Sequence, residues 1–423
     1  MSLPLGTMVR IAVRSLRQHF LSTTVTVISA ALAAGLVMAV FSVARQSSQA
    51  FQGGALGFDA VLGARGSATQ LVLNSVFHLQ TSPGNLPYKT YQEIKNDPRV
   101  AEAYPYAVGD NYRGFRIVGT VPELFTEHRV DGKPVFELPG HGQWFDPSRR
   151  QAVIGSVVAA ETGLKRGSDF HPTHSLDEHS DHVHDEDYVV TGVLKATNSP
   201  ADRVIWIPIE GMYRMAGHLL RGNGEEYHAE AGEAIPDENK EVSAVMLRLK
   251  SPDSGFLLQT KYNKEGKQAT LAWPIAAEVQ GLFQRLSWVS KVLVLVAYLV
   301  VVVAAGSLLA SLYNTMNERR REFAILRSLG ARRKTLLGVI VLESTLISLA
   351  GALLGYAICF GILSIAAGLI RGETGVVLDV FAYHPAMLWT PIGMLVVGAF
   401  AGLVPALKAY STDVSRELSQ SAA

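Results

Sequence analysis

Cysteine is almost absent from this chain, which has one, Cys359, in 423 residues. A single thiol cannot form an intramolecular disulfide, so no disulfide bond holds any domain of this chain together. Each folded domain must therefore be stabilised by its own hydrophobic core.

The chain also lacks common catalytic and nucleotide-binding motifs. It has no G-x-S-x-G, H-E-x-x-H or C-x-x-C sequence, and no Gly-rich loop followed by the Lys and Ser/Thr that hold a nucleotide's phosphates. Its net charge is only +1, and its basic residues cluster beside apolar runs instead of forming a nucleic-acid-binding surface. We predict a non-catalytic protein that binds no nucleic acid and leaves any ATP hydrolysis to another chain.

Charge is nearly absent from four long apolar runs, at about residues 21 to 44, 292 to 316, 336 to 368 and 386 to 407. A helix needs roughly 20 apolar residues to cross a hydrocarbon core of about 30 Å. The first run is too long for the apolar part of a cleaved signal peptide, the alternative for a basic segment followed by an apolar one. We therefore predict four transmembrane helices, with a large mixed α/β domain of two subdomains inserted between the first and the second.

Basic residues around these runs predict the orientation, because Lys and Arg in short loops stay on the cytoplasmic side. Arg10, Arg14 and Arg17 precede the first run, and seven basic residues lie between Arg319 and Lys334. The link between the third and fourth runs has only Arg371. We expect both termini in the cytoplasm and residues 46–288 outside.

The first segment, residues 1–45, is predicted to contain an amphipathic helix before the first crossing. Apolar side chains recur at helical spacing from Val9 to Phe20, and three arginines share another face. Such a helix lies in the cytoplasmic membrane interface. The alternative is a basic flank that only orients the crossing.

The outer segment, residues 46–288, alternates short runs rich in β-branched residues with short helical patterns. The predicted strands are Phe115–Val121, Ala152–Val158, Tyr188–Leu194, Val204–Ile209 and Val242–Leu249. The predicted helices are Tyr91–Asn96, Ile209–Ala216 and Pro274–Ser290. This pattern is more typical of a scaffold or binding module than of a catalytic domain.

The cytoplasmic loop at 317–334 reads NERRREFAILRSLGARRK, a short helix stopped by a glycine. It resembles permeases of the MacB/FtsX class of ABC transporters, which have E-R-x-R-E-x-x-x-x-x-x-x-G-A here. In that family the segment is the coupling helix that docks on the ATPase subunit. The resemblance implies this role for Glu318–Ala331, with these contact residues: Glu318, Arg319, Arg321, Glu322, Ala324, Ile325, Leu329, Gly330 and Ala331.

The resemblance extends over nearly the whole chain. The run after Arg10 and the run LLGVIVLESTLISLAGALLGYAICFG look like the family's first and third crossings, although Val414 in the last segment stands where the family often has proline. The resemblance implies a subunit of the bacterial inner membrane. Residues 1–45 and 289–423 would form its membrane part, and the segment between them a periplasmic domain. The resemblance also implies a cytoplasmic ATPase that binds ATP, a second permease copy, and motion relayed to the outer domain.

Three residues of the third crossing have a predicted packing or functional role. Gly351 and Gly355 are spaced for close helix packing, within the chain or against a second copy. Glu343 is an ionisable group in an apolar helix, which is costly unless it is paired or lies near the interface. We expect it either to face the bundle or to sit at the cytoplasmic boundary.

A histidine-rich segment at 171–184 interrupts the outer domain's resemblance to the family. It reads HPTHSLDEHSDHVH and contains five histidines among carboxylates: His171, His174, His179, His182 and His184. Imidazole suits zinc, copper or nickel, so we predict a loose metal site with zinc as the first candidate. The alternative is a solvated insertion that binds no metal. Isolated histidines such as His128 and His141 are expected at the surface.

The sequence leaves the transported substrate open. The histidine segment favours divalent metal handling or uptake, with a soluble metal-binding protein outside the membrane as a candidate partner. The alternatives are lipoprotein release or export of a peptide or lipid, and a signalling role that activates a cell-wall hydrolase.

Overall fold

The computed structural model describes residues 4–53, 55–174, 186–215, 235–266, 268–285, 287–318, 325 and 332–411. The chain divides into two compact units. The helical unit comprises Met1–Gln46, Ser287–Gly368 and Asp379–Ala423, and the outer domain comprises Ser47–Leu286 with Leu369–Leu378.

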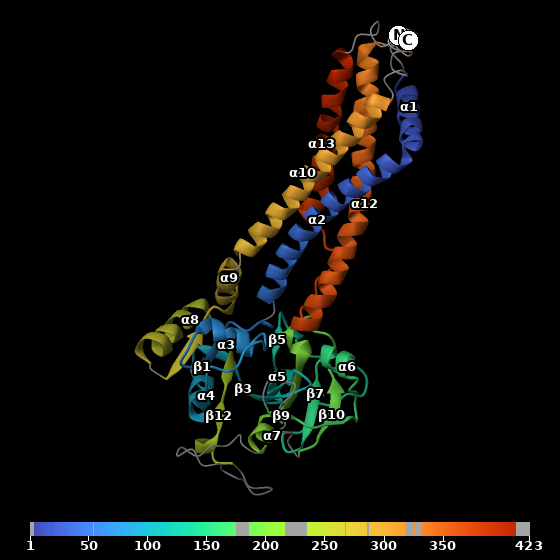
Figure 1. Ribbon diagram of the computed structural model, residues 1–423. Coiled ribbons are helices and arrows are strands. Elements are labelled where there is room, and N and C mark those ends of the chain that lie inside the picture. Colours follow the sequence, from blue (N-terminus) through green and yellow to red (C-terminus); the bar gives the residue numbers. More distant parts are fainter. Residues whose placement is uncertain are drawn as a thin grey trace. The chain divides into compact units, whose positions relative to one another are not determined.

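The helical unit confirms the four predicted crossings (Figure 1). Its helices are α1 (Leu5–Gln18), α2 (Phe20–Gly53), α10 (Ser287–Glu318), α12 (Arg333–Thr374) and α13 (Pro385–Ser411). Within the described residues, four of these are long and apolar enough to cross a membrane: α2, α10, α12 and α13. Their sequences are uniformly apolar around the helix, as expected where lipid or other helices surround every face.

Small residues bring these helices together. Gly398 and Gly402 of α13 lie against Ser348 and Ser344 of α12, so closely that a Cβ at either glycine would lie about 2 Å from the serine hydroxyl. Larger side chains at these positions would force the two helices apart.

The outer domain contains a ten-stranded mixed sheet in the order β14-β1-β13-β3-β4-β11-β7-β10-β8, with β9 paired to β3. Its strands are β1 (Ala60–Ala64), β3 (Val100–Tyr112), β4 (Phe115–Thr120), β7 (Gln151–Ile154), β8 (Asp169–Phe170), β9 (Thr173–His174), β10 (Tyr188–Val193), β11 (Val204–Pro208), β13 (Ala244–Leu249) and β14 (Ala269–Ala272). The domain also has two separate two-stranded sheets: β2 (Leu86–Pro87) with β12 (Glu241–Val242), and β5 (Arg129–Val130) with β6 (Lys133–Pro134). This mixed α/β domain between the first and second crossings is the predicted one.

Strand β3 connects two halves of the sheet. Its first half pairs with β13, and from Ala107 onward it pairs with β4. Sequence reasoning missed β3, because Pro105 and Gly109 resemble strand breakers. The Pro105 carbonyl nevertheless accepts a hydrogen bond from Thr120 Oγ1 at 2.9 Å.

Short helices cover the sheet. They are α3 (Ala68–Ser75), α4 (Tyr88–Lys95), α5 (Glu123–Thr126), α6 (Ser156–Thr162), α7 (Ile209–Tyr213), α8 (Pro252–Gln259) and α9 (Ile275–Arg285), with 3-10 turns at Pro200–Arg203 and Asp237–Asn239 and a π-helical turn at Thr260–Glu265. Side chains of β11 alternate between two buried clusters: Ile205 and Ile207 face one, while Val204 and Trp206 face the other. This period of two is that of a strand covered on both faces.

One predicted strand is half helix. Residues Ala152–Val158 were expected to be extended, but β7 ends at Ile154 and α6 begins at Ser156. The break is at Gly155, where a Cβ would lie 2.2 Å from the Asp202 carbonyl oxygen. The close backbone approach, which only glycine permits, ends the strand there.

The last part of α12 belongs to the outer domain. Residues Leu369–Leu378 are part of that unit, and Val376 and Leu378 are buried in it. Gly375, in a left-handed conformation with φ 73°, lies so close to Ser199 that a Cβ would be 2.7 Å from its carbonyl oxygen. One continuous helix thus begins in the helical unit and ends in the outer domain.

Candidate functional site

The predicted coupling segment is described at two positions. Glu318 is the last residue of α10, with its side chain 63% exposed, and its Oε2 lies 3.2 Å from His19 Nδ1. Ile325 is helical and exposed. The other predicted contact residues lie outside the described residues: Arg319, Arg321, Glu322, Ala324, Leu329, Gly330 and Ala331.

The structure describes the first four residues of the histidine-rich segment, which follow strand β8. His174 in β9 pairs with Asp110 of β3, and His171 Nε2 lies 3.1 Å from Asp187 Oδ1. This exposed ion pair joins the first residue of the segment to Asp187, three residues beyond its end. Predicted ligands His179, His182 and His184 lie outside the described residues, and the described part of the chain contains no group of three ligand side chains positioned for a metal ion.

The glycine pair of α12 lies against α2. A Cβ at Gly351 would be 2.5 Å from the Ala30 Cβ, and one at Gly355 would be 2.8 Å from the Ala34 Cβ. Two glycines facing two alanines let the two backbones approach closely. The pair therefore packs within the chain in this structure.

Glu343 faces the helix bundle. It is 5% exposed, and Ser15 Oγ of α1 donates a hydrogen bond to its Oε1 at 2.7 Å. Of the two alternatives for this carboxylate, the structure has the one in which it bonds to a neighbouring helix.

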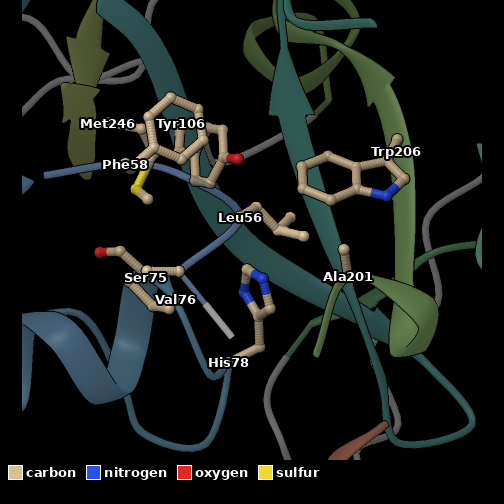
Figure 2. Close-up of a pocket in the computed structure, with 10 residues that line it drawn as sticks. Leu56, Phe58, Ser75, Val76, His78, Tyr106, Ala201, Trp206 and Met246 are labelled. Carbon is tan, nitrogen blue, oxygen red and sulfur yellow. The ribbon is translucent and has the colours of Figure 1, made fainter. Parts of the chain in front are cut away.

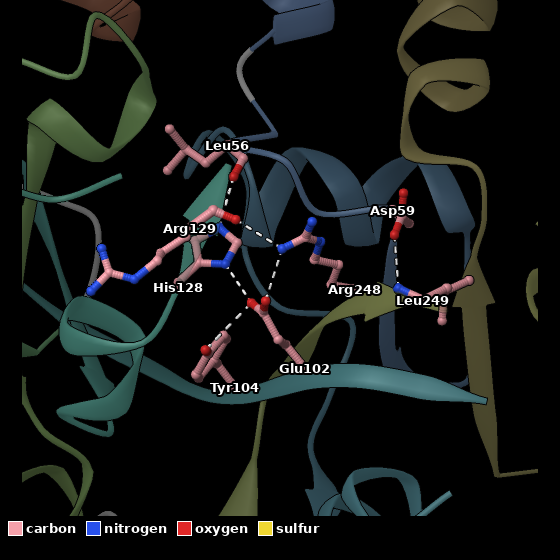
Figure 3. A network of polar contacts seen from close by, with 8 residues as sticks. All are labelled: Leu56, Asp59, Glu102, Tyr104, His128, Arg129, Arg248 and Leu249. Atoms are coloured by element: carbon pink, nitrogen blue, oxygen red, sulfur yellow. Dashed lines mark hydrogen bonds and ion pairs between the residues drawn. The ribbon is translucent and has the colours of Figure 1, made fainter. Parts of the chain in front are cut away.

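Sequence reasoning missed a polar network where the outer domain begins (Figure 3). We call residues 55–59, directly after α2, the entry segment. Leu56 in this segment has a left-handed backbone, with φ 52°, and its carbonyl oxygen lies 2.8 Å from His128 Nε2. A left-handed leucine is uncommon, so the surroundings must hold it in place.

His128 is fully buried, and the expectation that it lies at the surface was wrong. Its Nδ1 lies 2.6 Å from Glu102 Oε2, and its ring stacks on Phe58 with 4.2 Å between centroids. Each ring nitrogen thus lies within hydrogen-bonding distance of an oxygen atom. The histidine links the Leu56 carbonyl to the Glu102 carboxylate.

Glu102 is also held by neighbouring strands. Arg248 of β13 donates to its Oε1 at 2.9 Å and to the Arg129 carbonyl at 2.8 Å, and Tyr104 donates to its Oε2 at 3.4 Å. Burial and the Glu102 charge both raise the pKa of Tyr104. In the sequence, Glu102 and Arg248 are two residues of opposite charge far apart along the chain. Nothing there indicates that they lie opposite each other on neighbouring strands.

Ala55, Leu56 and Phe58 of the entry segment also line a small cavity (Figure 2). Figure 2 shows the Leu56 side chain among the lining residues, with Trp206 and His78 facing it. Trp206 is 1% exposed, and its ring makes edge contacts with Tyr106 and His78. Burial and the nearby Arg116 charge lower the pKa of His78 to about 3, so its ring is neutral. Leu56 thus connects the polar network with the aromatic core.

Two family comparisons cover most of the chain. Residues 23–259 match the MacB-like periplasmic core domain, and residues 294–414 match the FtsX-like permease C-terminal family. The chain belongs to the MacB/FtsX family of ABC transporter permeases. Membership makes it a multi-pass membrane permease with a periplasmic-type core domain, and it implies an ATPase partner and pairing with a second permease.

Two solved structures are similar to part of this MacB/FtsX permease. One is the periplasmic region of MacB from Actinobacillus actinomycetemcomitans, with 11% sequence identity and a TM-score of 0.30. The match covers 54% of this chain and 94% of the MacB region. The other is the extracellular domain of the noncanonic ABC-type transporter YknZ from Gram-positive bacteria, with 14% sequence identity and a TM-score of 0.29. The match covers 50% of this chain and 99% of the YknZ domain.

Proposed function

We propose that this permease relays ATP-driven motion from a cytoplasmic ATPase to its outer domain, and that the work serves divalent metal handling, with zinc as the first candidate. In this proposal Glu318–Ala331 contacts the ATPase, both termini are cytoplasmic, and two copies of the chain assemble with two ATPase chains. A metal-binding accessory protein outside the membrane is a further candidate partner.

The continuity of α12 supports the relay. The helix has 42 residues, which at 1.5 Å per residue is about 63 Å, roughly twice the hydrocarbon thickness. It begins directly after the proposed coupling segment and ends among residues that pack in the outer domain. A continuous helix transmits displacement without an intervening flexible link.

The composition and attachment of the histidine-rich segment support the metal hypothesis, and this observation carries the proposal. Five of the chain's 12 histidines lie between His171 and His184. His171, the first residue of the segment, pairs with Asp187, which lies just before strand β10. Neutral imidazoles beside carboxylates form a ligand set for zinc, copper or nickel.

Calorimetric titration of the full-length chain in detergent with zinc tests the metal site. We expect micromolar or tighter binding that is lost when the five histidines of 171–184 are replaced by serine. The His141→Ser variant, which removes one exposed histidine elsewhere in the outer domain, is the matched control and should bind as the parent does.

A deletion of residues 171–184 tests the role in the cell. We expect growth under zinc chelation to change, while unchanged growth together with absent binding would reject metal handling. Lipoprotein release or peptide or lipid export would then be the leading function, and photocrosslinking of lipid or lipoprotein to the outer domain would support it.

A further inference from the structure

Helix α1 packs on the helical unit through one face. Ala12 is fully buried and Ser15 is 2% exposed, while Arg10, Arg14 and Arg17 are exposed. At the start of α12, a Cβ at Gly338 would lie 2.5 Å from the Met8 methyl carbon. A helix that only lay on the membrane would turn its uncharged face to lipid, whereas this face contacts protein.

The hydrogen bond between Ser15 and Glu343 is the central contact of this face. It is buried, and it joins residues that are 328 positions apart in the sequence. A carboxylate in an apolar helix is retained where it has a partner and a role. Here the partner is a hydroxyl of α1, so the bond fixes α1 at one point along α12.

A second set of contacts reaches α10. His19, directly after α1, lies 3.2 Å from Glu318, the last residue of α10 and the first of the proposed coupling segment. Leu16 packs against a buried cluster drawn from α10, α12 and α13, comprising Leu308, Leu312, Ile347 and Ala401. Helix α1 therefore contacts both helices that flank the coupling segment.

We propose that α1 is a bracket that holds the ends of α10 and α12 at a fixed spacing, with Ser15–Glu343 as its anchoring bond. The coupling segment then displaces the two helices together instead of bending the loop between them. Ser15 and Glu343 are positioning residues in this account, which rests on the proposed coupling role of Glu318–Ala331.

Substitutions at Glu343 test the bracket in the complete complex of permease and ATPase. Glu343→Leu removes the acceptor and should lower the permease-dependent ATPase rate about tenfold, the change that 1.4 kcal/mol of lost stabilisation produces. Glu343→Gln keeps an oxygen acceptor for Ser15 and should stay within about twofold of the parent. Ser29→Ala, which removes a partly exposed serine whose hydroxyl donates to the Val25 carbonyl of its own helix, is the matched control and should have no effect.

The chain's single cysteine permits a second test that does not depend on the leucine variant. In a Cys359→Ser background, the Ser15→Cys, Glu343→Cys double variant lacks the hydrogen bond and should have the reduced rate. A short bifunctional thiol reagent that joins the two positions should restore it. A rate that stays low after complete crosslinking would overturn the proposal, as would a Glu343→Gln variant as impaired as Glu343→Leu.

A variant of the coupling segment separates the two proposals. If Glu322→Ala lowers the ATPase rate and Glu343→Leu does not, the bracket is rejected while the coupling role stands. If neither changes the rate, the coupling role and the bracket that rests on it both fail.

Discussion

The two units of this permease are packed by opposite means. In the helical unit, glycine and alanine allow backbones to approach, as at Gly355 against Ala34. In the outer domain, large rings fill the interior: Trp206 lies among Tyr106, Phe125 and Phe136, with ring centroids between 5.5 and 6.0 Å. The difference follows from the surroundings, because lipid gives no hydrophobic drive for helices to associate, whereas water strongly favours burying aromatic area.

The units also treat charge differently. In the outer domain the Glu102 carboxylate pairs with the Arg248 guanidinium and lies beside the buried His128 ring. The interior of the helical unit has the Glu343 carboxylate bonded to a serine hydroxyl. We expect substitutions to expose these contrasts, with the largest cost where a ring is removed from the outer core.

Trp206→Ala should destabilise the outer domain by about 3–5 kcal/mol, because it removes a buried ring that the surrounding strands cannot replace. Hydrogen exchange of β4, β7 and β11 in the full chain measures this. Leu257→Ala, at a half-exposed leucine of α8, is the control and should cost much less. Equal protection in both variants would show that the aromatic cluster does not dominate this core.

His128→Leu should destabilise the start of the outer domain by ~3 kcal/mol, because it removes the buried ring that bridges the Leu56 carbonyl and the Glu102 carboxylate. We expect faster hydrogen exchange in the entry segment. The surface pair Lys195–Glu137 gives the control, since Lys195→Ala breaks an exposed ion pair and should cost less than ~1 kcal/mol. A His128→Leu variant as stable as Lys195→Ala would contradict a structural role for the network.

Gly355→Leu should destabilise the helical unit by about 1–3 kcal/mol through overpacking against α2. Thermal unfolding of the purified full chain in detergent, followed by helical circular dichroism, measures the change. Gly361→Leu is the matched control on the same helix, because a Cβ there meets nothing within 4 Å. If both variants melt alike, close packing of α2 and α12 is not needed for stability.

Lowering the pH below neutrality should reduce the free energy of unfolding of the outer domain through His78. This is the smallest of the expected effects near pH 7. Burial holds the folded pKa of His78 near 3, below the model-peptide value of 6.5, so below 6.5 the unfolded chain takes up a proton that the folded chain does not. This contribution is therefore present above pH 6.5 and is lost as pH falls toward 3, by up to about 1.4 kcal/mol per pH unit. In His78→Asn, the stability measured between pH 7 and 5 should depend less on pH; an unchanged slope would assign the dependence to other groups.

Local patterns predicted the architecture well. Uncharged runs located the four crossings, and short runs rich in β-branched residues located β4, β10, β11 and β13, because these signals are contained in short stretches of chain. The prediction failed at Ala152–Val158, where the end of β7 depends on the approach of the Asp202 backbone. It also missed β3, whose proline and glycine are tolerated through contacts with distant strands.

Candidate sites divide in the same way. The coupling segment and the histidine-rich segment could be predicted because their residues are consecutive in sequence. The His128 network was missed because its members lie far apart along the chain and meet only when β3 and β13 pair with Glu102 opposite Arg248. The single charged residues that form it look like ordinary surface residues until the strand register is known.

The sequence by itself determined that this chain crosses the membrane four times, carries an outer α/β domain and resembles the MacB/FtsX permeases, since hydropathy and motif spacing are properties of neighbouring residues. Only the tertiary structure decided that α1 bonds to Glu343, that Gly351 and Gly355 pack on α2, and that His128 lies buried beside Leu56. These contacts join residues from distant parts of the chain, and their geometry depends on helix packing and strand register, which no short stretch of sequence specifies.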